Sequence, residues 1–198
     1  MDITEFWTLI EAARAQATNT VDDDGKAVAA HLTEQLAATS ELTIFEFEQH
    51  FETLDSALYR WDVWAAAYLI NGGCSDDAFM DFRAAVITQG RDWYERIAQN
   101  PDELADHPEV RAVAAGDRGS ALFQEVVNYV SARAYDQLTD EGTDMCDFYE
   151  AYDAFIGKDV PAPADLGEEF DFDDAAQMRA RLPRLAELFF TAPVRAAA

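Results

Sequence analysis

Apolar side chains recur at intervals of three and four residues along most of this chain, which is the periodicity of a helix that buries one face. The first such set comprises Phe6, Leu9, Ile10 and Ala13. Strands would instead alternate apolar and polar residues, and no segment of the sequence favours that alternation. The pattern therefore predicts an all-α protein.

Residues that favour helix ends divide this pattern into segments. Asp2 and Glu5 have the spacing of a capping box. Thr43 and Glu46 have the same spacing, and Ser75 has the features of an N-cap. The expected helices span about residues 3–17, 26–38, 43–59, 60–70, 75–90, 91–98, 121–138, 145–156 and 174–190, with short helical pieces within 102–115 and an interruption near Pro183.

Residues 60–70 are apolar on almost every helical face, which is typical of a helix surrounded by others. We therefore expect a single compact multi-helix domain with a central buried helix near residues 60–70. This helical core domain is predicted over residues 1–157. Residues 158–198 are predicted to form a loop rich in proline and acidic residues, anchored by Phe170 and Phe172, and a C-terminal helix that packs on the core.

The chain carries 39 acidic and 14 basic residues, for a formal net charge of −25, and its two halves carry nearly the same acidic excess. Proteins bind nucleic acids by neutralising phosphates with Lys and Arg, so a nucleic-acid partner is excluded. Anionic membrane surfaces are disfavoured for the same reason. The longest run without charged or strongly polar residues, 63–70, is much shorter than the roughly 20 residues that span a bilayer, so no membrane partner is expected.

Two cysteines, Cys74 and Cys146, are too few for a disulfide framework and too far apart for a zinc-binding pair. The N-terminus begins with acidic residues where a signal peptide needs basic ones, which predicts a cytoplasmic protein. The sequence contains no phosphate-binding glycine loop, no Gly-x-Ser-x-Gly motif and no histidine pair with metal-ligand spacing. We therefore expect no cofactor and no metal, and no catalytic residue is identified.

The most distinctive segment begins with Trp-Asp-Val-Trp at residues 61–64 and continues through Asn-Gly-Gly-Cys-Ser-Asp-Asp at 71–77 to Phe82 and Arg83. A Phe-Trp-Thr-Leu-Ile motif stands near the N-terminus at residues 6–10. Together these motifs resemble an uncharacterised bacterial family of domains of unknown function, numbered four-two-four-zero, over about residues 3–110. Leu-Pro-Arg-Leu at 182–185 resembles a trailing element of such proteins. The resemblance implies a family but no activity and no functional residues.

Asp62 lies within an apolar helical pattern, where an ionised carboxylate needs a partner such as Arg60 or Arg83. One interpretation is an ion pair that locks two helices together. The other is a ligand-binding pocket at the Gly-Gly-Cys-Ser-Asp-Asp corner, for a small molecule or a divalent metal. The candidate residues of that pocket are Trp61, Asp62, Trp64, Asp76, Asp77 and Arg83. Asp76 and Asp77 are also explained as acidic residues in the first turn of a helix.

Three hypotheses for function remain open. The first is a non-catalytic acidic module that binds or regulates another protein, with a basic protein as the partner. The acidic segment Phe170–Asp174 is either a docking site for such a partner or a solvated loop. The second is the pocket described above, with or without catalysis. The third is a scaffold adapted to high salt, and none of the three predicts an oligomeric state.

Overall fold

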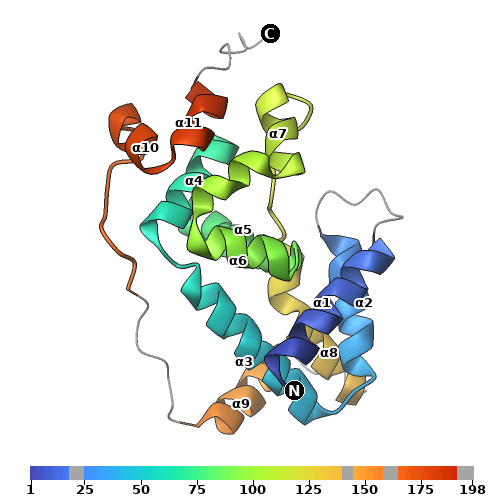
Figure 1. Cartoon of the computed structure of the whole chain (residues 1–198). Coiled ribbons are helices and arrows are strands. Elements are labelled where there is room, and N and C mark those ends of the chain that lie inside the picture. Colours follow the sequence, from blue (N-terminus) through green and yellow to red (C-terminus); the bar gives the residue numbers. More distant parts are fainter. Residues whose placement is uncertain (18–24, 140–144, 158–164, 191–198) are drawn as a thin grey trace.

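The computed structural model describes residues 1–17, 25–139, 145–157 and 165–190. These residues form helices and connecting loops without a strand, which confirms the predicted all-α class (Figure 1). The α-helices are α1 (Ile3–Ala17), α2 (Lys26–Ala37), α3 (Glu41–Ala57), α4 (Trp61–Asn71), α5 (Asp76–Thr88), α6 (Arg91–Gln99), α7 (Pro108–Ala115), α8 (Val130–Thr139), α9 (Met145–Ile156), α10 (Ala175–Arg181) and α11 (Pro183–Phe190). Two 3₁₀-helices, η1 (Pro101–Asp106) and η2 (Glu125–Tyr129), precede α7 and α8.

Two of the predicted helix starts are confirmed by side-chain caps. The backbone N–H of Asp2 donates to the Glu5 carboxylate at 2.7 Å, and the backbone N–H of Glu5 donates back to Asp2 at 2.9 Å. The Ser75 hydroxyl accepts the backbone N–H of Ala78 at 3.2 Å and begins α5. These short-range bonds depend on neighbouring residues alone, which is why the sequence identified them.

The predicted capping box at Thr43 and Glu46 is wrong. Ser40 is the N-cap of α3, and its hydroxyl accepts the backbone N–H of Thr43 at 3.2 Å. The helix therefore begins at Glu41, before the predicted start. It ends at Ala57, before the predicted end at Tyr59.

The helix predicted over residues 121–138 begins later than expected. Leu122 is buried and has a positive φ of 59°, which is incompatible with a right-handed helix. The backbone N–H of Ala121 donates to the side chain of Asn71 at 3.0 Å. These long-range contacts hold the chain in an irregular conformation up to η2, although the apolar spacing favours a helix.

The hydrophobic core is built around α4 and α5. Val63, Ala65, Ala66, Ala67, Leu69 and Ile70 of α4 are buried. The predicted central helix is therefore present, but Trp61, Trp64 and Tyr68 on its remaining side are only partly buried. In α5, Phe79, Phe82 and every residue from Ala84 to Thr88 are buried.

The remaining helices gather at opposite ends of the molecule (Figure 1). At the lower end, α2 packs against α1 and α8, and α8 also contacts α3 and α9. At the upper end, α11 packs against α10, α4, α7 and η1. The described C-terminal helices thus lie on the rest of the molecule, while a domain boundary at residue 157 stays a prediction.

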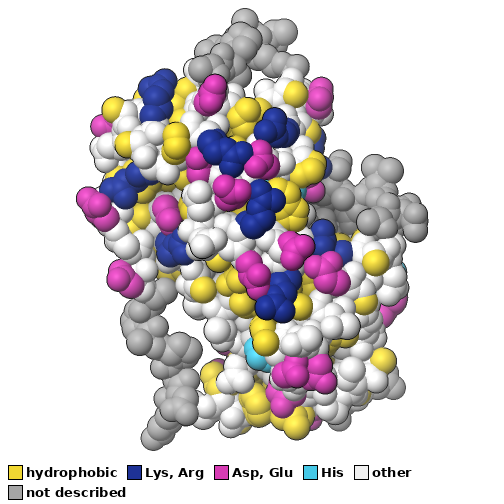
Figure 2. Space-filling view, viewed as in Figure 1, with side chains coloured by type: hydrophobic (Ala, Val, Ile, Leu, Met, Phe, Trp, Pro, Cys, Tyr) yellow, Lys and Arg dark blue, Asp and Glu magenta, His cyan; other side chains and the backbone are white. Residues whose placement is uncertain are grey.

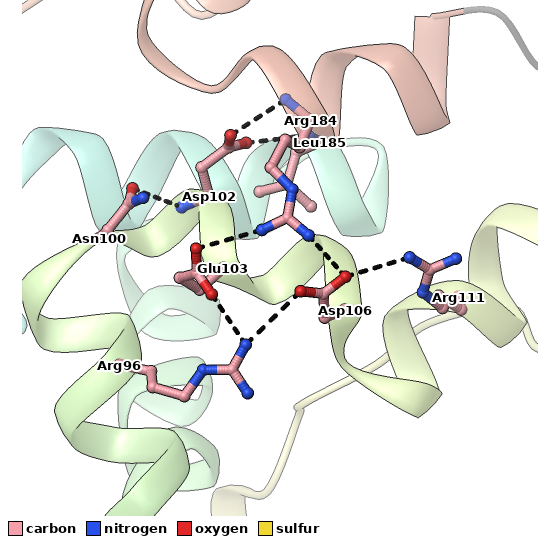
Figure 3. A network of polar contacts seen from close by, with 8 residues as sticks. All are labelled: Arg96, Asn100, Asp102, Glu103, Asp106, Arg111, Arg184 and Leu185. Atoms are coloured by element: carbon pink, nitrogen blue, oxygen red, sulfur yellow. Dashed lines mark hydrogen bonds and ion pairs between the residues drawn. The ribbon is translucent and has the colours of Figure 1, made fainter.

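An ion-pair network, which we call the clasp, holds α11 in place (Figure 3). The buried carboxylate of Asp102 in η1 accepts the backbone N–H groups of Arg184 at 3.0 Å and Leu185 at 2.9 Å. Because these donors are in the first turn of α11, Asp102 caps that helix, and its carboxylate interacts favourably with the positive end of the helix dipole. The remaining members of the clasp are Glu103, Asp106, Arg96, Arg111 and the Arg184 side chain. The Leu-Pro-Arg-Leu element at 182–185 is therefore the start of a clasped helix.

Candidate functional site

The partly buried side of α4 presents three aromatic rings in a row. Trp61 and Trp64 are nearly parallel, with ring centroids 5.6 Å apart. Phe172 contacts both Trp61, at 5.8 Å, and Tyr68, at 5.4 Å. Trp64 also stacks on buried Phe79 of α5 at 4.8 Å. The two predicted tryptophans therefore lie together in an aromatic cluster, and the predicted anchor Phe172 completes it.

Residues 165–174, which we call the 165–174 segment, are tied to α4 along this side. The backbone N–H of Trp61 donates to the carbonyl of Leu166 at 3.0 Å. The Tyr68 hydroxyl donates to Asp173 at 2.7 Å, and this bond raises the pKa of Tyr68. Phe170 is buried beneath the Arg181 guanidinium, which lies 4.3 Å from its ring centroid. The predicted anchoring by both phenylalanines is confirmed.

A pocket of about 520 Å³, which we call the aromatic pocket, lies between α4 and the 165–174 segment. It is lined by Trp61, Tyr68, Phe170, Phe172, Glu169, Asp171 and Asp173. All three charged residues in this lining are acidic, and the others are aromatic. Aromatic faces attract cations, and carboxylates pair with them. The pocket is therefore suited to a positively charged group.

Asp62 does not face this pocket but pairs with Arg60. Arg60 Nε lies 3.0 Å from one carboxylate oxygen of Asp62, and Nη2 lies 3.1 Å from the other. Arg60 also donates to the backbone carbonyl of Ala98 at 2.7 Å, so the pair joins the start of α4 to the end of α6. The expectation of a partner at Arg60 is confirmed. The other expected partner, Arg83, is wrong because its guanidinium pairs with Asp55 of α3.

The other predicted residues do not line the aromatic pocket. Asp76 and Asp77 are exposed in the first turn of α5. Arg83 lies against the rings of Tyr59 and Phe79, at 4.7 and 5.0 Å from their centroids. Within the described residues, no group of three or more His, Cys, Asp or Glu side chains is placed to hold a metal ion.

Cys74 follows α4 and is not activated as a nucleophile. Burial, together with the charge of Asp81, raises the pKa of its thiol to about 11. Its backbone carbonyl accepts the indole N–H of Trp64 at 3.0 Å. Because the reactive form of cysteine is the thiolate, this residue stays protonated at neutral pH and has a structural role.

Sequence reasoning missed three acidic side chains on α3, which we call the α3 carboxylates: Glu48, Glu52 and Asp55. Burial raises the pKa of Glu48 to about 7, and the nearby Ser131 hydroxyl opposes this increase. Burial also raises the pKa of Asp55 to about 6, despite the opposing charge of Arg83. Glu52 accepts the Tyr152 hydroxyl at 2.7 Å. Their spacing of four and three residues places them on one helical face, and this was the available signal.

Comparison with protein families gives one match. The profile of a family described as a protein of unknown function (DUF4240) matches residues 1–137. No curated protein and no solved structure matches the chain. In the part of the chain that the structure describes, no helix is long and apolar enough to cross a membrane. The matched region contains the motifs at residues 6–10 and 61–83 but not the element at 182–185, and the chain belongs to the DUF4240 family.

Proposed function

We propose that this protein is a non-catalytic acidic module that binds a basic protein, and that the aromatic pocket receives a Lys or Arg side chain of that partner. The aromatic pocket is the observation that carries the proposal. It joins two features that favour cation recognition, which are aromatic rings in the lining and nearby carboxylates. Two of these carboxylates, Asp171 and Asp173, belong to the acidic segment Phe170–Asp174, for which the sequence left open a docking site or a solvated loop.

Arg181 supports this proposal because it already uses the same chemistry. Its guanidinium lies 4.3 Å from the Phe170 ring centroid and pairs with Glu168 at 2.9 Å. An arginine held between a ring and a carboxylate thus occurs at the edge of the same segment. A partner's side chain would meet an equivalent pair in Phe172 and Asp171, which line the pocket.

The charge of the whole molecule supports the same partner. A net charge of −25 steers a basic protein toward the surface and repels polyanions. Binding of this kind weakens as salt screens the charges. We therefore expect the affinity for a basic partner to fall steeply between low and physiological ionic strength.

Calorimetric titration with a short peptide of alternating lysine and glycine tests the proposal. The matched control peptide carries acetyl-lysine, which keeps the length and removes the charge. We expect the lysine peptide to bind and the acetylated peptide to bind at least about tenfold more weakly. Equal binding of the two peptides, or no binding of the lysine peptide at low salt, would contradict the proposal.

Three matched variants locate the interaction. Asp171→Asn and Asp173→Asn each remove one negative charge from the pocket. The remaining side-chain oxygen can still accept the bond that residue 171 receives from the backbone N–H of residue 173 and the bond that residue 173 receives from the Tyr68 hydroxyl. Asp165→Asn makes the same change in the same segment, outside the pocket lining. We expect each pocket variant to weaken lysine-peptide binding about fivefold and Asp165→Asn by less than about twofold. Equal losses in all three would indicate non-specific attraction.

The alternative, a small-molecule or divalent-metal pocket at the Gly-Gly-Cys-Ser-Asp-Asp corner, has less support. Asp76 and Asp77 are exposed, and the first turn of α5 explains their presence. Titration with Mg²⁺ and Ca²⁺ of the native protein and of Asp77→Asn tests this alternative. Binding that is abolished by Asp77→Asn without a change in stability would favour it over the aromatic pocket.

A further inference from the structure

A second pocket, of about 620 Å³, lies where three helices end. We call it the helix-end pocket. It is lined by the last residues of α4, of α7 and of α11, together with Gly119 and part of the 165–174 segment. Figure 1 shows α4, α7 and α11 gathered at the upper end of the molecule. The volume falls within the range of about 300–1,000 Å³ that is typical of small-molecule sites.

The helix ends give this pocket a negative electrostatic potential. Backbone carbonyls point toward the C-terminal end of a helix, where the helix dipole is negative. Gly72 ends α4 and Gly116 ends α7, each in a left-handed conformation, with φ of 68° and 78°. Within the described residues, no hydrogen bond reaches the carbonyls of Ile70 and Asn71 or those of Ala114 and Ala115. Both helix ends therefore contribute carbonyls that remain available to a ligand.

The side chains of the lining add to this potential. Asp173 is the one charged residue among the described residues that line the pocket. It is held by the Tyr68 hydroxyl at 2.7 Å, which leaves its second oxygen to accept a further bond. Elsewhere the walls are largely apolar, with Val113 of α7 and with Phe189 and Phe190 of α11.

We propose that the helix-end pocket binds a small organic cation, in which an ammonium group is carried on an apolar body. The ammonium group would lie near Asp173 and the carbonyls at the ends of α4 and α7, and the apolar body would contact the walls. A bare metal ion is a poorer occupant because the apolar walls offer it no ligands. The helix-end pocket shares Tyr68, Phe172 and Asp173 with the aromatic pocket, but its lining at α7 and α11 is its own, so the two proposals can be tested separately.

Three probes of similar size and different charge test the chemistry by calorimetric titration. They are 2-phenylethylammonium, the neutral 3-phenylpropanol and the anionic 3-phenylpropionate. We expect the cation to bind at least about tenfold more tightly than the neutral probe and the anion to show no binding. Equal affinity for the cation and the alcohol would overturn the proposal, and so would the absence of binding by the cation.

Gly119 allows the pocket to be blocked. It lines this pocket but not the aromatic pocket, and a Cβ placed there meets no other atom within 4 Å. We expect Gly119→Phe to reduce binding of 2-phenylethylammonium by more than about tenfold. Ser120→Phe adds the same ring at the next, exposed position, outside the lining, and we expect it to leave binding unchanged. Full binding by Gly119→Phe would place the cation elsewhere and overturn the proposal.

Charge variants provide a second test that does not depend on a bulky substitution. Asp173→Asn removes the carboxylate of the helix-end pocket, whereas Asp171 lines only the aromatic pocket. We expect Asp173→Asn to weaken 2-phenylethylammonium about fivefold and Asp171→Asn to leave it unchanged. Equal effects of the two variants would overturn the assignment to the helix-end pocket.

The two proposals fail separately. Gly119→Phe is expected to retain the lysine peptide and lose the small cation. Asp171→Asn is expected to weaken binding of the lysine peptide about fivefold and to leave binding of the small cation unchanged. A protein that binds the lysine peptide but no probe contradicts only the helix-end pocket, and the converse contradicts only the basic partner.

Discussion

The clasp and the α3 carboxylates each draw three acidic residues from one helix, and the protein compensates the charges of the two sets differently. In the clasp, Glu103 and Asp106 pair with arginines, and Asp102 accepts two backbone N–H groups. Hydrogen bonds from Arg184 and Arg111 lower the pKa of Asp106. Each carboxylate of the clasp therefore has an ion-pair or hydrogen-bond partner.

The α3 carboxylates have one arginine among them. Arg83 pairs with Asp55, while Glu52 accepts a tyrosine hydroxyl and Glu48 is buried beside Ser131. Burial raises the pKa of both Glu48 and Asp55. The pKa of Asp106 in the clasp is thus lowered, whereas the pKa values of Glu48 and Asp55 on α3 are raised.

Basic side chains are unevenly distributed over one face of the molecule. Figure 2 shows Lys and Arg side chains over the upper and middle parts of one face, interspersed with acidic residues. On that face, the lowest part of the described surface shows acidic and hydrophobic side chains without a basic one.

Removing Arg83, the ion-pair partner of Asp55, should have the largest effect. Arg83→Met leaves the Asp55 carboxylate, which is 20% exposed, without its ion-pair partner. We expect a loss of about 3 kcal/mol in the free energy of unfolding at pH 8, measured by urea denaturation. The loss should be smaller at pH 5, because Asp55 then takes up a proton.

A double variant controls for the loss of packing by the arginine. Asp55→Asn combined with Arg83→Met removes both charges, so it should recover most of the lost stability at pH 8. If the double variant is as unstable as Arg83→Met, the arginine acts through its contacts with Tyr59 and Phe79 instead.

The stability that the clasp contributes should depend on Asp102 more than on its arginines. Asp102→Ala leaves the backbone N–H groups of Arg184 and Leu185 without their acceptor. We expect a loss of about 2 kcal/mol in the free energy of unfolding. Arg184→Ala removes a side chain that is 41% exposed and should have a much smaller effect in the same urea titration. The reverse order would show that the ion pairs dominate.

The third prediction concerns the dependence of stability on pH. Because the pKa of Glu48 is raised from 4.5 to about 7 in the folded protein, the native state binds a proton that the unfolded chain releases. The resulting stability is present below pH 4.5 and is lost as the pH rises to about 7. We expect on the order of 2 kcal/mol less stability at pH 8 than at pH 5.

Glu48→Gln isolates this effect from general charge repulsion. The variant should match the native protein at pH 5 and exceed its stability at pH 8, because its side chain does not ionise. The carboxylates of the clasp, such as Asp106, whose pKa is lowered, are the same in both proteins. They should therefore not change the difference in stability between the variant and the native protein. Parallel pH profiles for the two proteins would contradict a buried, titrating Glu48.

Much of the fold could be predicted from the sequence because local signals determine most helix ends. The capping bonds of Asp2 and Ser75 involve residues within three positions. Leu122 shows the limit, since its backbone conformation depends on a buried connection to α4 that apolar spacing does not reveal.

The candidate site was predicted only in part, for the same reason. Trp61 and Trp64 could be grouped because they lie on one helical face, and Phe172 could be identified as an anchor from its apolar character. The ion-pair partner of Arg83 could not be predicted, because Asp55 and Arg83 lie on different helices that meet only in the folded chain. The α3 carboxylates were missed because burial depends on α5, α8 and α9, whose packing the α3 pattern does not specify.

The wall formed by Tyr68, Phe172 and Asp173 lines both pockets, which makes their occupancies thermodynamically linked. If both proposals hold, an organic cation that pairs with Asp173 at the helix ends would weaken the pairing of the same carboxylate with a lysine of the partner. By reciprocity, whatever factor the small cation imposes on the affinity for a basic partner, the partner imposes on the affinity for the cation. Two pockets that both prefer cations and share one carboxylate would therefore compete for their ligands, although each pocket also has lining residues of its own.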